Sequence, residues 1–145
     1  MRVFQILSIA ITLMIGEARG QQLESGAVVI AHSEVTQQAL SQRQLQRIFM
    51  LKQRAWQDGQ PITLIVFSSD NQRHSAFLRQ HLKMFPYQLE REWNKLIYSG
   101  QSAPPVVATD PDTMLELVAS TPGAIGYLVS TPPGSAVKVI EVNRE

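Results

Sequence analysis

The chain has 145 residues, no cysteine, 13 Lys plus Arg against 12 Asp plus Glu, and a formal net charge of +1. A nearly neutral chain without charge runs argues against a nucleic-acid partner, which would need a clustered basic face. The lack of cysteine excludes disulfides as a source of stability. We therefore expect a chain whose stability comes from a single hydrophobic core.

The first twenty residues have the pattern of a secretory signal peptide. Residues 1–2 are a short positive start, residues 6–15 are apolar, and residues 18–20 (Ala-Arg-Gly) offer small side chains at the positions a signal peptidase reads. The apolar run is too short for a membrane span, and no cysteine follows that could carry a lipid. We expect a periplasmic or secreted mature chain that forms one domain, residues 21–145.

The first predicted strand and helix follow directly. Residues 26–32 (GAVVIAH) are a continuous apolar run, which is typical of a strand buried on both faces. Ser41 followed by Gln44 has the spacing of a capping box at the start of a helix. The apolar side chains on one face of this helix are Leu45, Ile48 and Phe49.

A turn at residues 56–59 (WQDG) leads into a second predicted strand, residues 61–67. A polar break then precedes a helix that we expect to end near Phe85. Pro86 suits the first turn of a further helix, and Gly100 is placed to end it. The apolar stripe of this further helix contains Leu89, Trp93, Leu96 and Ile97.

The remaining predicted elements are short. Residues 101–108 must be extended because they contain two consecutive prolines. A helix begins near residues 110–111 (Asp-Pro), residues 121–129 form a strand interrupted by glycines, and residues 137–142 form a final strand. Strands that alternate with helices predict an α/β fold with a mostly parallel sheet flanked by helices. The inward side chains of the last helix are Met114, Leu117 and Val118.

The sequence gives little support for catalysis or metal binding. It contains no G-x-S-x-G motif, and His32, His74 and His81 lie beside no serine motif. His74 and His81 lie about 10 Å apart on one helix, too far to share a metal ion. We interpret these two as partly exposed surface residues and expect no enzymatic activity, no metal site and no cofactor.

The polar break at residues 68–73 has two interpretations. Ser68, Ser69 and Asn71 supply donors at a helix start, where free N–H groups and the positive dipole end favour an anion. Arg73 adds a guanidinium that suits phosphate or carboxylate. The same residue types are also the preferred N-caps of any helix, and Asp70 would repel an oxyanion that kept no proton. Both interpretations remain open from the residues alone.

The glycines of residues 121–127 (TPGAIGY) are also open to two interpretations. Glycine inside a strand marks a bulge or a close approach by another backbone or a ligand. Gly123 and Gly126 could equally serve a helix-to-strand turn followed by tight packing.

In their order and spacing, these motifs resemble the periplasmic phosphate-binding proteins of ABC transporters, within the type-2 periplasmic-binding-protein superfamily. The likeness extends over residues 27–128. It implies the fold of one lobe of such a protein, and a small oxyanion, with phosphate as the first candidate, held by Ser68, Ser69, Asn71 and Arg73. The matching residues are Leu40, Ser41, Leu45, Ile48, Phe49, Lys52, Trp56, Asp58, Gly59, residues 69–77, Trp93, Ser99, Gly100, Pro104, Pro105 and residues 122–127.

The chain departs from this family at the phosphate-binding segment and in length. A Ser-Gly-Thr segment that holds phosphate in the family corresponds here to Asn71, Gln72 and Arg73, so the glycine and both hydroxyls are absent. The relatives have two lobes that close on the ligand, and this chain corresponds to one. A buried anion needs donors on all sides, so a second chain, as in a homodimer, would have to complete the site.

The alternative function is a lobe that has lost its ligand and acts through protein–protein contact. Its partner would be a membrane transporter, a sensor ectodomain or an outer-membrane complex. We interpret the turn at Trp56 as exposed, and this turn or the loop at residues 104–105 would form the contact surface.

Overall fold

The computed structural model describes residues 26–132 and 134–144. The predicted signal peptide, residues 1–20, lies outside these residues. Within the described part, no helix combines the length and the apolar character that crossing a membrane requires.

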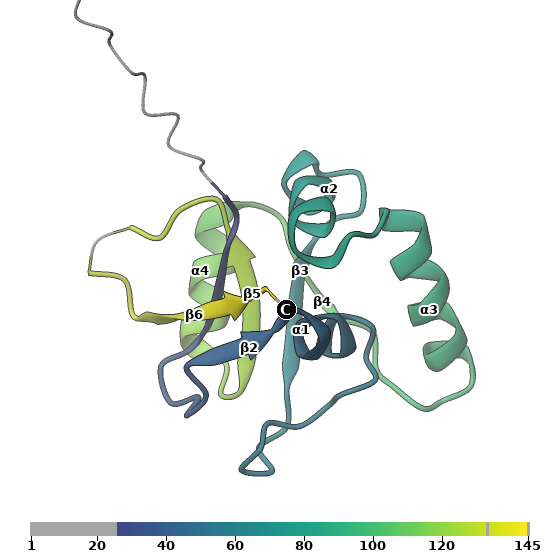
Figure 1. The fold of residues 1–145 in the computed structure, drawn as a ribbon, viewed down its shortest axis with the longest axis horizontal. Helices are drawn as coiled ribbons and strands as arrows, with labels where there is room; N and C mark the ends of the chain where they lie inside the picture. The colour runs from purple at the N-terminus through teal and green to yellow at the C-terminus, as the bar shows by residue number, and fades with distance from the viewer. Residues whose placement is uncertain (1–25, 133, 145) are drawn as a thin grey trace, which may run out of the picture.

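A six-stranded sheet, in the order β2-β6-β1-β5-β3-β4, forms the centre of the molecule (Figure 1). The pairings β2–β6, β3–β4 and β3–β5 are parallel, whereas β1 pairs antiparallel with both of its neighbours. The predicted α/β class is confirmed, and the sheet is mixed because of β1. The strands are β1 Val28–His32, β2 Ala39–Ser41, β3 Thr63–Phe67, β4 Val106–Ala108, β5 Ala124–Leu128 and β6 Val137–Asn143.

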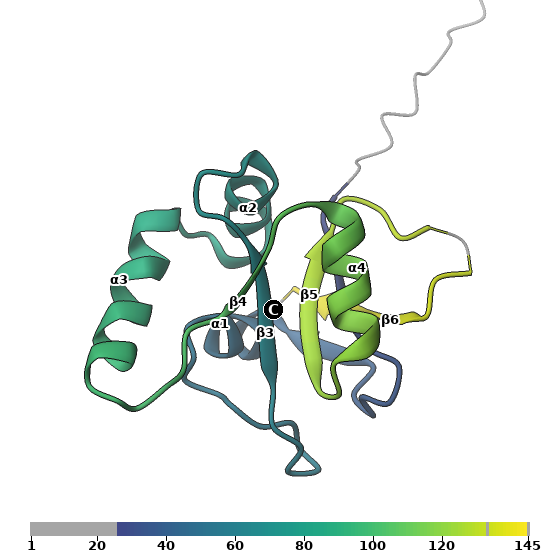
Figure 2. The ribbon, with the colours of Figure 1, turned by 180° about the vertical axis from the view of Figure 1, so that it is seen from behind.

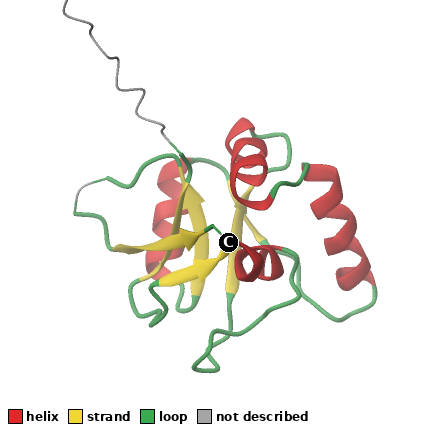
Figure 3. Ribbon diagram, in the orientation of Figure 1, coloured by secondary structure: helices red, strands yellow, loops and turns green. Residues whose placement is uncertain are grey.

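Helices flank this sheet, as the colouring by secondary structure makes plain (Figure 3). The helix predicted after the polar break consists of two parts, α2 and the π-helix η1 that follows it directly. The C-cap of η1 is Lys83, whose φ of 54° is left-handed. The helices are α1 Gln42–Phe49, α2 Gln72–Phe77, η1 Leu78–Leu82, α3 Pro86–Tyr98 and α4 Pro111–Ser120.

The two faces of the sheet are covered by different helices. Gly126 of β5 faces α4, since a Cβ built there would lie 2.6 Å from the Met114 sulfur. The next residue, Tyr127, points to the opposite face, where its ring stacks on Phe77 of α2 at a centroid distance of 4.1 Å. Figure 2 shows α4 in front of β5, with α1 and α2 behind the strands. The sheet is therefore buried between α4 on one side and α1 and α2 on the other.

Local sequence signals account for the start of α1. The Gln44 N–H donates to the Ser41 hydroxyl at 3.1 Å, and the Ser41 N–H donates to the Gln44 side chain at 2.9 Å. The predicted capping box is therefore present, and it satisfies two N–H groups at the helix start. The C-terminal end of α1 is held by α3, because the Trp93 indole donates to the Phe49 carbonyl at 2.6 Å.

The two glycines of β5 and its preceding turn serve backbone geometry and packing. Gly123 has a φ of 75°, and a Cβ there would lie 2.1 Å from the Pro61 carbonyl oxygen. Gly126 allows α4 to approach the sheet closely. Both interpretations therefore apply in part, because Gly123 forms the turn at a close approach by the Pro61 backbone and Gly126 allows the tight packing.

The interpretation of the 56–59 turn as exposed holds for residues 57–59 but is wrong for Trp56 itself. The Trp56 side chain is 3% exposed, and its indole N–H donates to the Gly123 carbonyl at 3.0 Å. The indole is buried because it fastens the 56–59 turn to the start of β5, a contact between segments far apart in the sequence. Trp56 is a core residue and is not a contact surface.

Candidate functional site

The predicted site residues all lie in the turn between β3 and the first turn of α2. Ser68, Ser69 and Arg73 are exposed, and Asn71 is half-buried. The turn closes through the Asn71 N–H, which donates to the Ser68 carbonyl at 2.9 Å. Because β3 ends at Phe67 and α2 begins at Gln72, the four side chains are presented at the carboxyl end of a buried strand.

Asn71 is the N-cap of α2. Its side-chain oxygen accepts the Arg73 N–H at 2.9 Å, and its backbone is extended, as expected for this position. The capping interpretation of the polar break is therefore correct for Asn71. Its amide NH₂ group and the Gln72 N–H, which has no acceptor within the helix, are the donors that the cap leaves at the helix start.

Asp70 changes the electrostatics of the turn. The Ser68 hydroxyl donates to the Asp70 carboxylate at 2.5 Å, so this hydroxyl is engaged within the turn. Arg73 forms no ion pair with any other described residue. The turn thus presents one guanidinium and a few neutral donors beside one carboxylate, an arrangement that suits a protonated oxyanion better than a fully ionised one.

Two buried side chains, Tyr127 and His74, are hydrogen-bonded next to the turn. The Tyr127 hydroxyl accepts the N–H of Phe67, the last residue of β3, at 3.0 Å, and lies 2.6 Å from Nδ1 of His74 in α2. One hydroxyl therefore joins the end of β3 to the start of α2. The imidazole tautomer sets the direction of the bond between the hydroxyl and Nδ1.

The interpretation of His74 as a surface residue is wrong. Its side chain is 0% exposed, and its Nε2 atom has no hydrogen-bond partner among the described residues. Burial lowers the pKa of His74 below its ordinary value of 6.5, and the nearby Glu90 carboxylate partly opposes this effect. His74 is therefore a neutral core residue. Its spacing from Phe77 and Leu78 places it on the apolar face of the helix, a signal that the sequence contained.

The residues that the structure describes offer no metal centre, since they include no group of three or more His, Asp or Glu side chains placed to hold an ion. Nor do His74 and His81 form a pair. His74 bonds Tyr127, whereas the His81 Nε2 atom lies 2.7 Å from the Ala27 carbonyl.

Comparison with known proteins finds similarity at the level of structure. No family model and no curated protein sequence matches the chain. A proposed phosphate ABC transporter substrate-binding protein from Clostridium perfringens, solved with bound phosphate, superposes with a TM-score of 0.65 at 17% identity, over 81% of this chain and 44% of that one.

Two further solved structures give the same result. PstS from Borrelia burgdorferi has a TM-score of 0.58 at 14% identity, over 81% of this chain and 47% of that one. An ABC-type phosphate transport receptor from Vibrio cholerae has a TM-score of 0.52 at 15% identity, over 81% and 46%. The chain thus spans less than half the length of these proteins.

The fold is that of part of a phosphate ABC transporter substrate-binding protein, corresponding to a single lobe. The predicted resemblance is confirmed at this level, and the low identities limit the comparison to the fold. The names of these neighbours describe binding and transport proteins.

Proposed function

We propose that the chain is a non-catalytic solute-binding protein of the periplasm that holds a small oxyanion at the β3–α2 turn. Residues 1–20 would direct its export and then be removed. Phosphate is the first candidate ligand, and an ABC transporter is the corresponding membrane partner. The observation that carries the proposal is the strand-to-helix turn of a phosphate-binding-protein fold, with Ser68, Ser69, Asn71 and Arg73 at its exposed surface.

The ligand would be bound through hydrogen bonds and one charge. The positive end of α2 and the Arg73 guanidinium favour an anion, and the Ser69 hydroxyl and the Asn71 amide add neutral donors. Asp70 favours an anion that retains a proton to donate to its carboxylate. Because the turn is exposed, a facing protein surface would be needed to exclude water and raise the affinity.

Calorimetric titration with phosphate, with sulfate and acetate in parallel, tests this proposal. We expect heat of binding at millimolar phosphate, and a Kd at least tenfold weaker in Arg73→Ala, equivalent to about 1.4 kcal/mol. Sulfate should bind more weakly than phosphate, because at neutral pH it has no proton to donate to Asp70. Asp70→Asn should remove that preference.

Arg79→Ala is the matched control, because Arg79 is an exposed arginine on η1, away from the turn. Its affinity for phosphate should equal that of the wild type. Absence of both heat and a thermal shift at millimolar phosphate would sink the proposal. Binding that survives Arg73→Ala unchanged would show that the site lies elsewhere.

The second candidate function is a protein-interaction module for a transporter, sensor or outer-membrane partner, or for a second copy of the chain. It is favoured by Tyr87 and Tyr98 of α3, which are 60% and 87% exposed. Aromatic side chains are enriched at protein interfaces. Sedimentation and cross-linking should then show an association that a Tyr87→Ser, Tyr98→Ser double variant loses and Arg73→Ala retains.

A further inference from the structure

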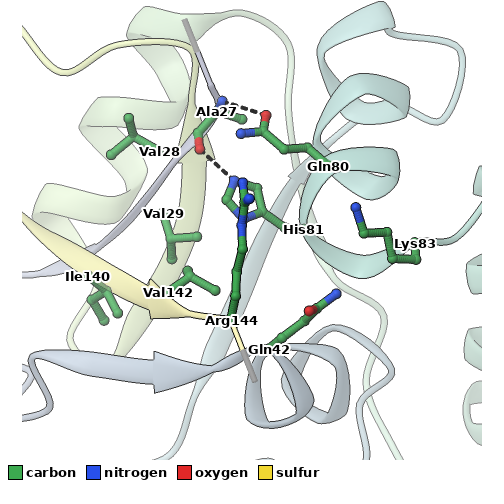
Figure 4. Close-up of a pocket in the computed structure, with 10 residues that line it drawn as sticks. All are labelled: Ala27, Val28, Val29, Gln42, Gln80, His81, Lys83, Ile140, Val142 and Arg144. Atoms are coloured by element: carbon green, nitrogen blue, oxygen red, sulfur yellow. Dashed lines mark hydrogen bonds between the residues drawn. The ribbon is translucent and has the colours of Figure 1, made fainter. Parts of the chain in front are cut away.

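A cavity of about 340 Å³ lies at the other end of the α2–η1 segment from the β3–α2 turn (Figure 4). Its walls come from the start of β1, the C-terminal half of β6, the end of η1 and the first residue of α1. The volume falls within the range of small-molecule sites, roughly 300–1,000 Å³. None of the residues assigned to the β3–α2 turn lines it.

Three basic side chains border this cavity. His81 comes from η1, Lys83 follows η1, and Arg144 follows β6. None of the described lining residues is Asp or Glu, and neither Lys83 nor Arg144 forms an ion pair with another described residue. Positive charge at the cavity is therefore not neutralised by the described part of the chain.

The helix dipole explains only part of this cluster. Basic groups are favourable at a helix C-terminus, which accounts for His81 and Lys83 at the end of η1. Arg144 belongs to a different element, and the fold of β6 beside β1 brings it to the same cavity. Gln42, the first residue of α1, also lines the cavity. The N-terminal end of α1, which is the positive end of its dipole, therefore lies at the cavity as well.

The charges of Arg144 and Lys83 act on His81, which lines the same cavity. Burial is the largest cause that lowers the pKa of His81, and the charges of Arg144 and Lys83 lower it further. A hydrogen bond to the Ala27 carbonyl opposes the shift. An anion in the cavity would offset the charges of Lys83 and Arg144 and would favour protonation of His81.

The opposite wall of the cavity is apolar. Val29 and Ile140 are buried, and Val142 is half-buried beside them. Figure 4 shows all three on the strand side, His81 and Lys83 on the helical side, and Arg144 at the end of β6. The helical wall is fixed to β1 by two hydrogen bonds, since the Gln80 side chain accepts the Ala27 N–H at 3.0 Å and His81 bonds the Ala27 carbonyl. The cavity is thus an ordered, two-sided site.

We propose that this cavity binds a small organic carboxylate, with the carboxylate among His81, Lys83 and Arg144 and the aliphatic part against the valine and isoleucine wall. An inorganic anion would leave that apolar wall unused and would itself be desolvated by it. A neutral aliphatic ligand would leave Lys83 and Arg144 without a counter-charge. The site is separate from the β3–α2 turn and does not depend on the oxyanion proposed there.

Titration of the purified protein with hexanoate, hexanamide and acetate tests both halves of the site. Hexanamide has the shape of hexanoate without its charge, and acetate has the charge without the aliphatic chain. We expect hexanoate to bind at least tenfold more tightly than either. Equal affinities for hexanoate and hexanamide, or no binding of hexanoate at millimolar concentration, would overturn the proposal.

Two variants locate the charge without disturbing the fold. Lys83→Asn removes the charge and keeps a residue type that tolerates the left-handed φ of 54°, and Arg144→Gln changes an exposed residue beyond β6. The double variant should weaken hexanoate at least tenfold and leave the far-UV circular dichroism unchanged. Arg79→Gln, an exposed charge on η1 outside the cavity, should bind hexanoate as the wild type does.

Methyl NMR identifies where hexanoate binds. The methyl resonances of Val29, Ile140 and Val142 should shift on titration, while those of Val106 and Val107 on β4 should not. A saturable shift confined to other methyl groups would refute the assignment, as would hexanoate affinity that the double variant leaves unaltered.

Discussion

The Tyr127 hydroxyl is the group on which the geometry of the β3–α2 turn depends most directly. It bonds the last residue of β3 and the imidazole of His74 in α2, while its ring packs against Phe77 and Phe49. The ring supplies apolar burial and the hydroxyl satisfies two polar groups that would otherwise be buried without a partner. The polar side chains of the β3–α2 turn are exposed, but the end of β3 and the start of α2 on either side of it are joined through Tyr127.

Burial of neutral His74 makes stability depend on pH. Its pKa is lowered in the folded state, so below about 6.5 the unfolded chain binds more protons than the folded one. We expect the free energy of unfolding to fall as pH decreases from 7.5 to 5, by at most about 1.4 kcal/mol per pH unit from this residue. His81, whose pKa is also lowered mainly by burial, adds a contribution of the same sign.

Urea unfolding at several pH values measures this dependence. His74→Phe keeps an aromatic ring and removes the titration, so its stability should vary less between pH 7.5 and 5 than that of the wild type. His81→Gln provides the comparison for the second histidine. An identical pH dependence in wild type and His74→Phe would contradict the assignment.

Among the elements, the packing of α4 on β5 depends on a glycine in the strand. Gly126 lies beneath Met114 and Val118 of α4, and a Cβ there would come within 2.6 Å and 3.1 Å of their side chains. Since α4 also contacts β1 and β3, a shift of this helix would be felt across the centre of the sheet. Glycine at this position therefore sets the distance between the helix and the sheet.

Gly126→Ala should destabilise the protein by about 1–3 kcal/mol, the usual cost of overpacking a core. Denaturant unfolding measures the effect. Because the nearest atom belongs to the flexible Met114 side chain, the double variant Gly126→Ala, Met114→Ala should be more stable than the sum of the two single changes predicts. Strict additivity would show that the two residues do not meet.

Over the whole molecule, the central strands of the sheet are longer and more buried than its two edge strands. The five-residue strands β1, β5 and β3 are central and mostly buried, whereas each edge strand, β2 and β4, has three residues. Val106 and Val107 of β4 are exposed on the edge. Such short edges limit unwanted strand pairing between molecules, and they also predict unequal local stability.

Native-state hydrogen exchange should reveal this difference. Hydrogen-bonded amides of β1 and β5 should exchange only through global unfolding, and those of β4 through local opening. A difference of about 3 kcal/mol in opening free energy would slow exchange at the centre roughly 100-fold relative to the edge. Uniform protection across β1 and β4 would contradict this expectation.

Most of the order of elements could be predicted, because hydrophobic runs, caps and prolines act locally. The capping box at Ser41 and the polar break before α2 are examples. The three-residue β2 was missed, since so short a strand has no recognisable period and exists only through its pairing with β6. The antiparallel pairings of β1 were also missed. Strand direction within a sheet depends on how distant segments assemble, and no local pattern encodes it.

The sequence by itself determined the class of the fold and the position of the β3–α2 turn, since both follow from alternation of apolar and polar segments along the chain. Only the tertiary structure decided that Trp56 is buried and that His74 bonds Tyr127, because the partners Gly123 and Tyr127 lie far away in the sequence. The cavity at His81, Lys83 and Arg144 has the same origin. Local patterns fix which segments fold into helices and strands, and packing between distant segments fixes which side chains meet.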